Sequence, residues 1–179
     1  TNYGILPLRE EISRYLAERF QVKYDPRSEV LVTVGASEAI DIALRAILSP
    51  GDEVLIPEPC YISYQACTRF AGGVPVQVHT HVNNDFELDA NDLAANITLK
   101  SKVLILSYPS NPTGAVLPRD KMAAVAKLAI QHDLFVICDE IYSELVYDGY
   151  KQTSMASLPG MWERTMTISG FSKAFAMTG

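Results

Sequence analysis

Apolar residues recur along this chain with two different spacings, and each spacing predicts a different kind of element. Where they recur every three or four residues with charged residues between, the pattern predicts helices. These segments are 6–20, 36 to the Pro50-Gly51 stop, 60 to the Gly72-Gly73 stop, 87–97, and a stretch that begins at Pro118. Short runs that are apolar at nearly every position predict buried strands instead. These runs are 29–35, 53–57, 74–80, 101–109, 134–140 and 165–170.

The alternation of strands and helices predicts the fold class. Continuous apolar strands, each separated from the next by a helix, are typical of a mostly parallel sheet that is covered on both faces. The chain is therefore predicted to be an α/β protein with three layers, α/β/α, and a length of 179 residues favours one domain over 1–179.

Composition narrows the choice of partners and compartment. Hydrophobic residues make up 48% and charged residues 20%, as in a globular protein that dissolves in water. A net charge of −6 argues against nucleic acid or an anionic membrane as partner, and no apolar run approaches the length of a membrane span. Three cysteines without a CxxC pair favour neither a disulfide framework nor a zinc site, so a cytoplasmic location is predicted.

Polar and aromatic residues follow the predicted strands at the points where these end. In open α/β sheets, ligands bind beyond the carboxyl ends of the strands, so these residues are candidates for a site. They are Ala36 and Ser37 after the first strand, Tyr61 after the second, Asn111 after the fourth, Asp139 and Tyr142 after the fifth, and Ser169, Ser172 and Lys173 after the sixth.

Each of these positions has a structural explanation beside a functional one. The turn at Ala36 and Ser37 could hold a phosphate at a helix N-terminus, or Ser37 could be a helix cap. Asp139 could face a protonated ring nitrogen or cap the next helix. Lys173, among small and apolar residues, could attack a carbonyl as a neutral amine, or could be a surface lysine. Asn111 could belong to a tight turn.

A metal site is not predicted. His79 and His81 are spaced to point to the same side of a strand, but no third ligand accompanies them, and a metal site needs more ligands than two. The acidic stretch around 85–92 is most simply a solvated loop with the start of a helix.

Three motifs together resemble one family. They are YPSNPTG at 108–114, CDEIYSELVYDG at 138–149 and SGFSKAFAMTG at 169–179. With the turn at Ala36 and Ser37, the ordered set resembles the large domain of fold-type I enzymes that use pyridoxal 5′-phosphate, and among them the class I/II aminotransferases. The resemblance extends from LPLREEI, at residue 6, to the end of the chain.

The resemblance implies a role for each candidate. Lys173 would form a Schiff base with the cofactor aldehyde and later move the substrate proton, while Asp139 would keep the pyridine nitrogen protonated. Tyr142 would hydrogen-bond the phenolic oxygen of the cofactor together with Asn111, and Tyr61 would stack on its ring. The phosphate would be held by Ala36 and Ser37, with a further contact from Ser169 or Ser172.

The resemblance also implies a reaction and an assembly. One L-amino acid leaves its amino group on the cofactor and a 2-oxo acid collects it, in a ping-pong sequence. Family members work as homodimers and carry an N-terminal segment and a C-terminal small domain outside the part matched here. Since the chain begins at Thr1 rather than Met, we expect 1–179 to be most of the large domain of a longer protein, and to be inactive alone.

Two other functions stay open at this point. Carbon–sulfur β-lyases and aminocyclopropane-carboxylate synthases share the lysine, the aspartate and much of the SNPTG region. A domain of the same fold also occurs in some transcriptional regulators, where it is fused to a DNA-binding module. The KAFAMTG run, at 173–179, favours the aminotransferase.

Overall fold

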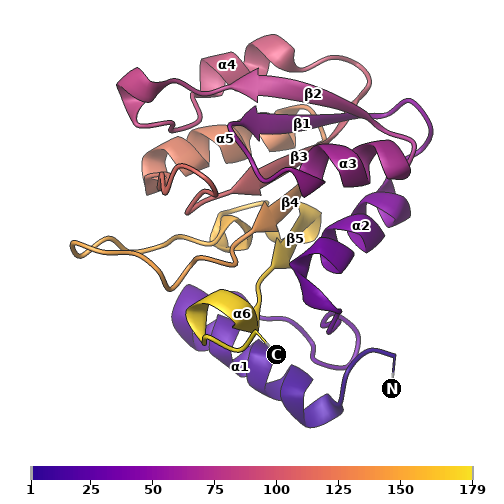
Figure 1. Ribbon diagram of the computed structural model, residues 1–179, viewed down its shortest axis with the longest axis vertical. Helices are drawn as coiled ribbons and strands as arrows, with labels where there is room; N and C mark the ends of the chain where they lie inside the picture. Colours follow the sequence, from indigo (N-terminus) through magenta and orange to yellow (C-terminus); the bar gives the residue numbers. More distant parts are fainter. Residues whose placement is uncertain (1, 179) are drawn as a thin grey trace.

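A five-stranded, wholly parallel sheet forms the centre of the computed structural model, which describes residues 2–178 (Figure 1). The strands lie in the order β2-β1-β3-β4-β5. They are β1 Glu53–Glu58, β2 Val74–His79, β3 Ser101–Ser107, β4 Phe135–Asp139 and β5 Thr165–Ile168. The helices are α1 Leu6–Phe20, α2 Gly35–Ile47, α3 Ser63–Phe70, α4 Ala90–Asn96, α5 Arg119–Gln131 and α6 Phe171–Ala174, with short 3-10 turns η1 Val82–Asn84, η2 Met155–Ser157 and η3 Trp162–Arg164.

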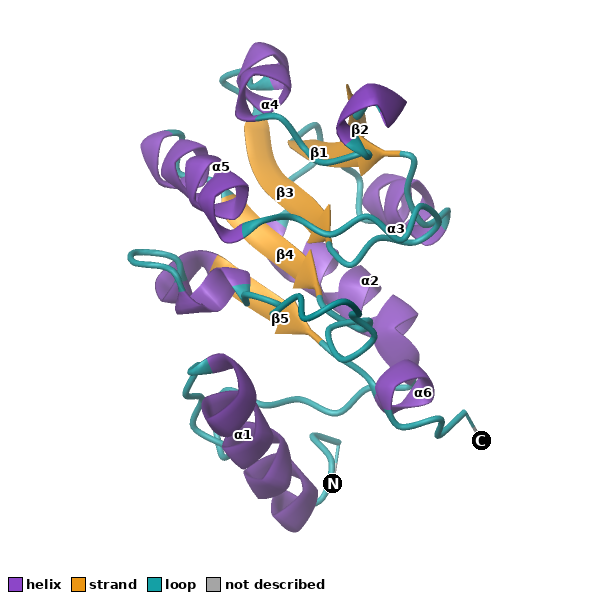
Figure 2. Cartoon of the chain, turned by 90° about the vertical axis from the view of Figure 1, so that its left-hand side faces the viewer, coloured by secondary structure: helices purple, strands orange, loops and turns teal. Residues whose placement is uncertain are grey.

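Helices cover both faces of the sheet, which confirms the predicted three-layer α/β/α fold (Figure 2). Successive strand residues point to opposite faces, so a strand that is apolar throughout supplies two cores. Leu104 and Leu106 of β3 pack with α4 and α5 on one face. Val103 and Ile105 of the same strand pack with α2 and α3 on the other face.

The register places the ends of the central strands level with one another. Ser107 of β3 pairs with Asp139 of β4, and Asp139 pairs with Ile168 of β5. The parallel pairing continues one step further, since the Glu140 N–H donates to the Ile168 carbonyl over 2.8 Å. Residues that follow these strands therefore begin from a common edge of the sheet.

The predicted strand at 29–35 is wrong. Residues 30–33 carry no strand assignment, and Leu31 and Val34 expose 48% and 90% of their surface. One backbone contact of this segment, from the Val32 N–H to the Tyr3 carbonyl at 3.1 Å, ties it to the start of the chain. A β-branched run indicates an extended chain, whereas a strand also needs a neighbour to pair with, and this segment pairs with none of the strands within 2–178.

Helix α1 lies apart from the two main cores (Figure 2). Leu16 and Phe20 pack with Val22 and with Ala156 of η2, and these four buried residues form a small cluster of their own. The Ser13 hydroxyl adds a hydrogen bond to the Tyr24 carbonyl at 2.5 Å. The position of α1 thus depends on a limited number of contacts.

We predict that Leu104→Ala lowers the free energy of unfolding by about 2–5 kcal/mol, because it leaves a cavity at a fully buried position of β3. The matched control is Leu99→Ala in an exposed turn, which should change stability by no more than about 0.5 kcal/mol. Urea titration measures both values, and equal effects of the two substitutions would contradict the proposed core.

Candidate active site

Asp139 is buried at the carboxyl end of β4, with 4% of its surface exposed. It points to the face covered by α2 and α3, where the Tyr64 hydroxyl donates to Oδ2 over 2.7 Å. The Ile141 N–H donates to Oδ1 over 3.2 Å, so the carboxylate also stabilises the turn that follows it. Asp139 is therefore held by two neutral donors, one from α3 and one from its own loop.

The charge of Asp139 has no opposite partner within residues 2–178, where it takes part in no ion pair. Burial raises its pKa, and the hydrogen bonds from Tyr64 and Ile141 oppose that rise. A buried carboxylate is costly without a cation. A ligand that presents a protonated nitrogen would remove that cost, so this position fits the ring nitrogen of pyridoxal phosphate.

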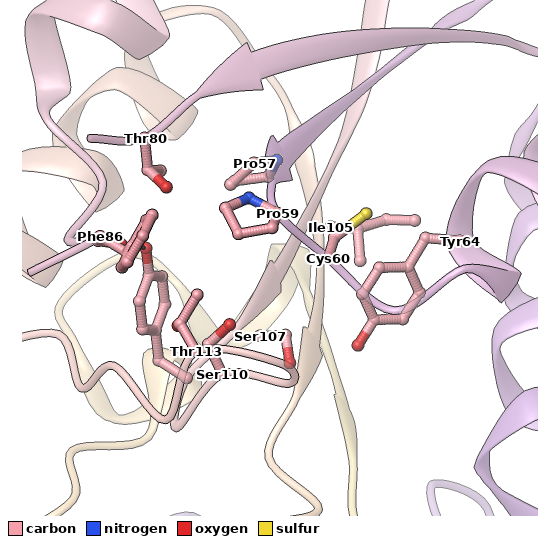
Figure 3. Close-up of a pocket in the computed structure, with 11 residues that line it drawn as sticks. Pro57, Pro59, Cys60, Tyr64, Thr80, Phe86, Ile105, Ser107, Ser110 and Thr113 are labelled. Carbon is pink, nitrogen blue, oxygen red and sulfur yellow. Dashed lines mark hydrogen bonds between the residues drawn. The ribbon is translucent and has the colours of Figure 1, made fainter. Parts of the chain in front are cut away.

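Tyr64 is a site residue that sequence reasoning missed. It is buried, and its ring meets that of Tyr61 edge to face with the centroids 5.7 Å apart. Tyr61 precedes α3, so helical spacing does not relate it to Tyr64, and the partner of Tyr64 lies 75 positions away in the sequence. Tyr64 and Ser107 also line a small pocket at the ends of β1 and β3 (Figure 3).

Tyr61 and Ser37 meet at the start of α2. Hydrogen bonds from Ser63 and from Ser37 lower the pKa of the Tyr61 hydroxyl. Ser37 is the third residue of α2 and Val34 is the N-cap, so Ser37 is not the cap; Glu38 instead reaches back to the Val34 N–H. The first-turn amides of a helix have no partner within it, so Ala36 and Ser37 lie where a phosphate could be bound.

Asn111 and Tyr142 border the same cleft. It has a volume of about 810 Å³ and lies between the loop after β3 and the loop after β4. Both side chains are half-buried, so each keeps access to solvent. The structure therefore brings together two residues that are 31 positions apart in the sequence.

Lys173 lies on the short helix α6, five residues beyond the end of β5. Its side chain is exposed, and within the described chain Nζ makes no ion pair or hydrogen bond. Ser169 is exposed and Ser172 half-buried on the same turn. Because Ile168 is level with Asp139, the turn that carries Lys173 starts from the edge at which Asp139 lies.

The histidines form no metal centre in the part of the chain that is described. His81 Nε2 lies 3.6 Å from Asp92 Oδ2, and both side chains are largely exposed. No group of three His, Cys, Asp or Glu side chains within 2–178 could hold a metal ion. In the same range, no helix is long and apolar enough to cross a membrane.

Glu140 is a second buried acid, and it lies on the opposite face of β4 from Asp139. It is 1% exposed, and Oε1 accepts a hydrogen bond from the Met155 N–H at 3.1 Å. Oε2 has no partner among the described residues, and burial raises the pKa of Glu140 to about 7. Glu140 ties the end of β4 to η2, a role for which the sequence offered no signal.

The fold and the placement of these groups define a parallel α/β domain with a candidate ligand site at the carboxyl ends of its strands. The family can be given as well: the model for aminotransferase class I and II matches residues 1–179, so the chain belongs to that family. The resemblance seen in the three motifs is thereby confirmed.

Known relatives agree with this assignment. The Bacillus subtilis protein YugH, named as an aminotransferase on a provisional basis, is 54% identical over 178 residues, which is 99% of this chain and 46% of YugH. An aspartate aminotransferase of Pyrococcus abyssi is 46% identical with the same coverage. The crystal structure of an aromatic aminotransferase from Pyrococcus horikoshii superposes with a TM-score of 0.98 at 44% identity, over 99% of this chain and 48% of that one. The chain spans about half the length of these relatives.

We predict that Tyr64→Phe raises the pKa of Asp139 further, because it removes the hydrogen bond that favours the carboxylate. The pKa can be followed through the carboxyl carbon by NMR. The control is Tyr108→Phe, another buried tyrosine, whose hydroxyl donates to the Phe86 carbonyl at 2.8 Å. An unchanged Asp139 titration in Tyr64→Phe would contradict the contact.

The raised pKa of Glu140 leads us to predict that the stability of the protein depends on pH. Its folded pKa of about 7 lies above the usual 4.5, so the folded state keeps a proton that the unfolded state has lost between these values. The stabilisation that Glu140 contributes is thus fully present below pH 4.5. The free energy of unfolding falls by about 3 kcal/mol as the pH rises to 7.

The variant Glu140→Gln should flatten that decline, because a neutral amide keeps the acceptor for the Met155 N–H and has no charge to bury. Denaturant titrations between pH 4.5 and 8 measure the effect. The exposed Glu18→Gln serves as control and should leave the decline as it is. The same slope in Glu140→Gln and wild type would count against a buried, protonated Glu140.

Proposed function

We propose that the complete protein is an aminotransferase that depends on pyridoxal 5′-phosphate and moves an amino group from an L-amino acid to a 2-oxo acid. Residues 1–179 would form most of its large, cofactor-binding domain. The observation that carries this proposal is the buried Asp139, which has no cationic partner among residues 2–178 and lies at the edge from which the Lys173 turn starts. Family membership supports the same reaction.

The residues at this edge fit the groups of the cofactor. Asp139 would pair with the ring nitrogen and Tyr61 would lie against the ring. Asn111 and Tyr142, which share a cleft, would donate to the phenolic oxygen. The helix start at Ala36 and Ser37 would bind the phosphate, with Ser169 or Ser172 as a further contact. The chain thus offers an acid, an amine, hydroxyl and amide donors and an aromatic face, which is the set that this cofactor requires.

The protein's own groups would work on the proton of the substrate. When bound, the cofactor supplies an aldehyde and a ring that withdraws electrons. Lys173 Nζ would hold the cofactor through a Schiff base and then, once free, take the proton from the substrate Cα. Asp139 would be kept charged by the protonated ring nitrogen, and Asp139 would in turn keep the proton on that nitrogen.

Several finer points belong to the same proposal. We infer a ping-pong reaction, a homodimer in the complete protein and a cytoplasmic location, which are typical of the family. Relatives are named for aspartate, aromatic and kynurenine substrates, so an L-amino acid and a 2-oxo acid are proposed as the substrate classes. These aminotransferase names favour the transferase over a β-lyase or a regulator.

Borohydride reduction of the intact protein with pyridoxal phosphate tests the proposal. We expect the phosphopyridoxyl label on Lys173 after peptide mass mapping, because reduction makes the bond between amine and aldehyde permanent. Lys173→Arg should lose the label, whereas Lys151→Arg, an exposed lysine on another loop, should keep it.

Label on a different lysine, or none, would refute the assignment of Lys173. A second assay separates the reactions, since an aminotransferase converts a 2-oxo acid to an amino acid without releasing pyruvate and thiol from cystathionine. Pyruvate and thiol as main products would favour a lyase instead.

A further inference from the structure

One side chain of α1 contacts both loops that carry proposed catalytic residues. Tyr15 donates its hydroxyl proton to Glu144 Oε1 over 2.6 Å, and Glu144 lies two residues after Tyr142. The ring of Tyr15 meets that of Phe175 edge to face at 5.8 Å between centroids, and Phe175 lies two residues after Lys173. These loops are far apart in sequence, and both lie 120 residues or more from Tyr15.

The contact with Glu144 is charged and has a defined geometry. Arg19, one helical turn beyond Tyr15, donates through Nε to Oε1 at 2.9 Å and through its terminal NH2 to Oε2 at 2.6 Å. This two-point contact holds the pKa of Glu144 below its usual value, so the carboxylate is charged at neutral pH. Burial, followed by the hydrogen bond to Glu144, raises the pKa of Tyr15, which keeps its proton and stays a donor.

The contact with Phe175 reaches the Lys173 turn itself. Phe175 packs against Phe171 at 5.9 Å between centroids, and the Phe175 N–H donates to the Phe171 carbonyl at 3.3 Å. Helix α6 has four residues, too few to be stable by hydrogen bonding alone. The turn therefore depends on packing of its two phenylalanines, and Tyr15 packs against one of them.

Resting on the function proposed above, we propose that Tyr15 is a positioning residue that sets the Lys173 turn relative to Tyr142. Tyr15, Arg19, Glu144 and Phe175 form what is here named the α1 clamp. The cofactor would lie between the amine of Lys173 and the hydroxyl of Tyr142, so a shift of either loop changes how firmly a proton is held at Lys173 Nζ. The clamp acts on the reaction through these two residues and touches neither substrate nor cofactor.

Two conservative substitutions in the intact protein test the clamp. Tyr15→Phe removes the hydroxyl and keeps the ring on Phe175, and Glu144→Gln keeps the shape and removes the charge. The matched control is Glu18→Gln, which breaks an exposed ion pair with Arg14 inside the same helix. If Tyr15→Phe or Glu144→Gln folds poorly, Arg19→Gln is a further variant, because it removes the ion pair with Glu144 by changing a largely exposed side chain.

The first measurement is the pH midpoint of the absorption change of pyridoxal phosphate bound to Lys173. A weaker hydrogen bond from Tyr142 leaves the proton at Lys173 Nζ more firmly held, so both clamp variants should raise the midpoint, by about 0.5 to 1 pH unit. The double variant should shift it by less than the sum of the two, because Tyr15 and Glu144 act through one contact. Glu18→Gln should leave it unchanged.

The second measurement needs no cofactor. Amide hydrogen exchange in residues 169–177 should be about 2- to 10-fold faster in the clamp variants than in wild type or Glu18→Gln. Variants that lower the melting temperature but leave both the midpoint and these exchange rates as in wild type would overturn the proposal. If wild type shows no label and no absorption change at Lys173, the proposed function fails, while the exchange rates still decide whether the clamp holds the turn.

Discussion

A carboxylate removed from water at the end of an inner strand is the constraint on which the proposed site depends. Asp139 is buried by the register of β3, β4 and β5, which brings their ends level and leaves the side chain under α3. Two neutral donors moderate the cost of its charge without cancelling it. The buried carboxylate therefore offers a candidate position for a positive group, and the loops that carry the other candidate residues follow strands that end at the same edge of the sheet.

The two acidic residues at the end of β4 point to opposite faces of the sheet and make different contacts. Asp139 points to the α2 and α3 side, toward Tyr64. Its carboxylate has no cationic partner among the described residues, so it suits a positively charged ligand. Glu140 points to the other side, where its contact with Met155 fixes the loop that returns to β5. The alternation of a strand separates adjacent carboxylates in this way, so one can serve a cofactor while its neighbour secures the scaffold.

Loops beyond the strands carry most of the proposed chemistry, and their positions rely on contacts from distant elements. Tyr142 and Lys173 lie on segments with little regular structure, and α1 contacts both through Tyr15. Since α1 belongs to neither main core, it is well placed to influence the site without disturbing the sheet. Precision in such a site comes from supporting contacts as well as from the residues that meet the ligand.

Periodicity and short motifs are local signals, and they predicted five of the six described α-helices, the three-layer fold and the family. Five of the six predicted strands are also present, whereas the short helix α6 was not predicted. Sequence reasoning misjudged 29–35, because an extended run becomes a strand only when another strand lies beside it. It also left out Tyr64, Glu140 and Tyr15. Tyr64 and Tyr15 act through partners 75 and 129 positions away, and the role of Glu140 depends on which face of β4 it occupies and on the loop that returns to it. Such contacts form only when folding brings remote segments together, so no local pattern in the sequence predicts them.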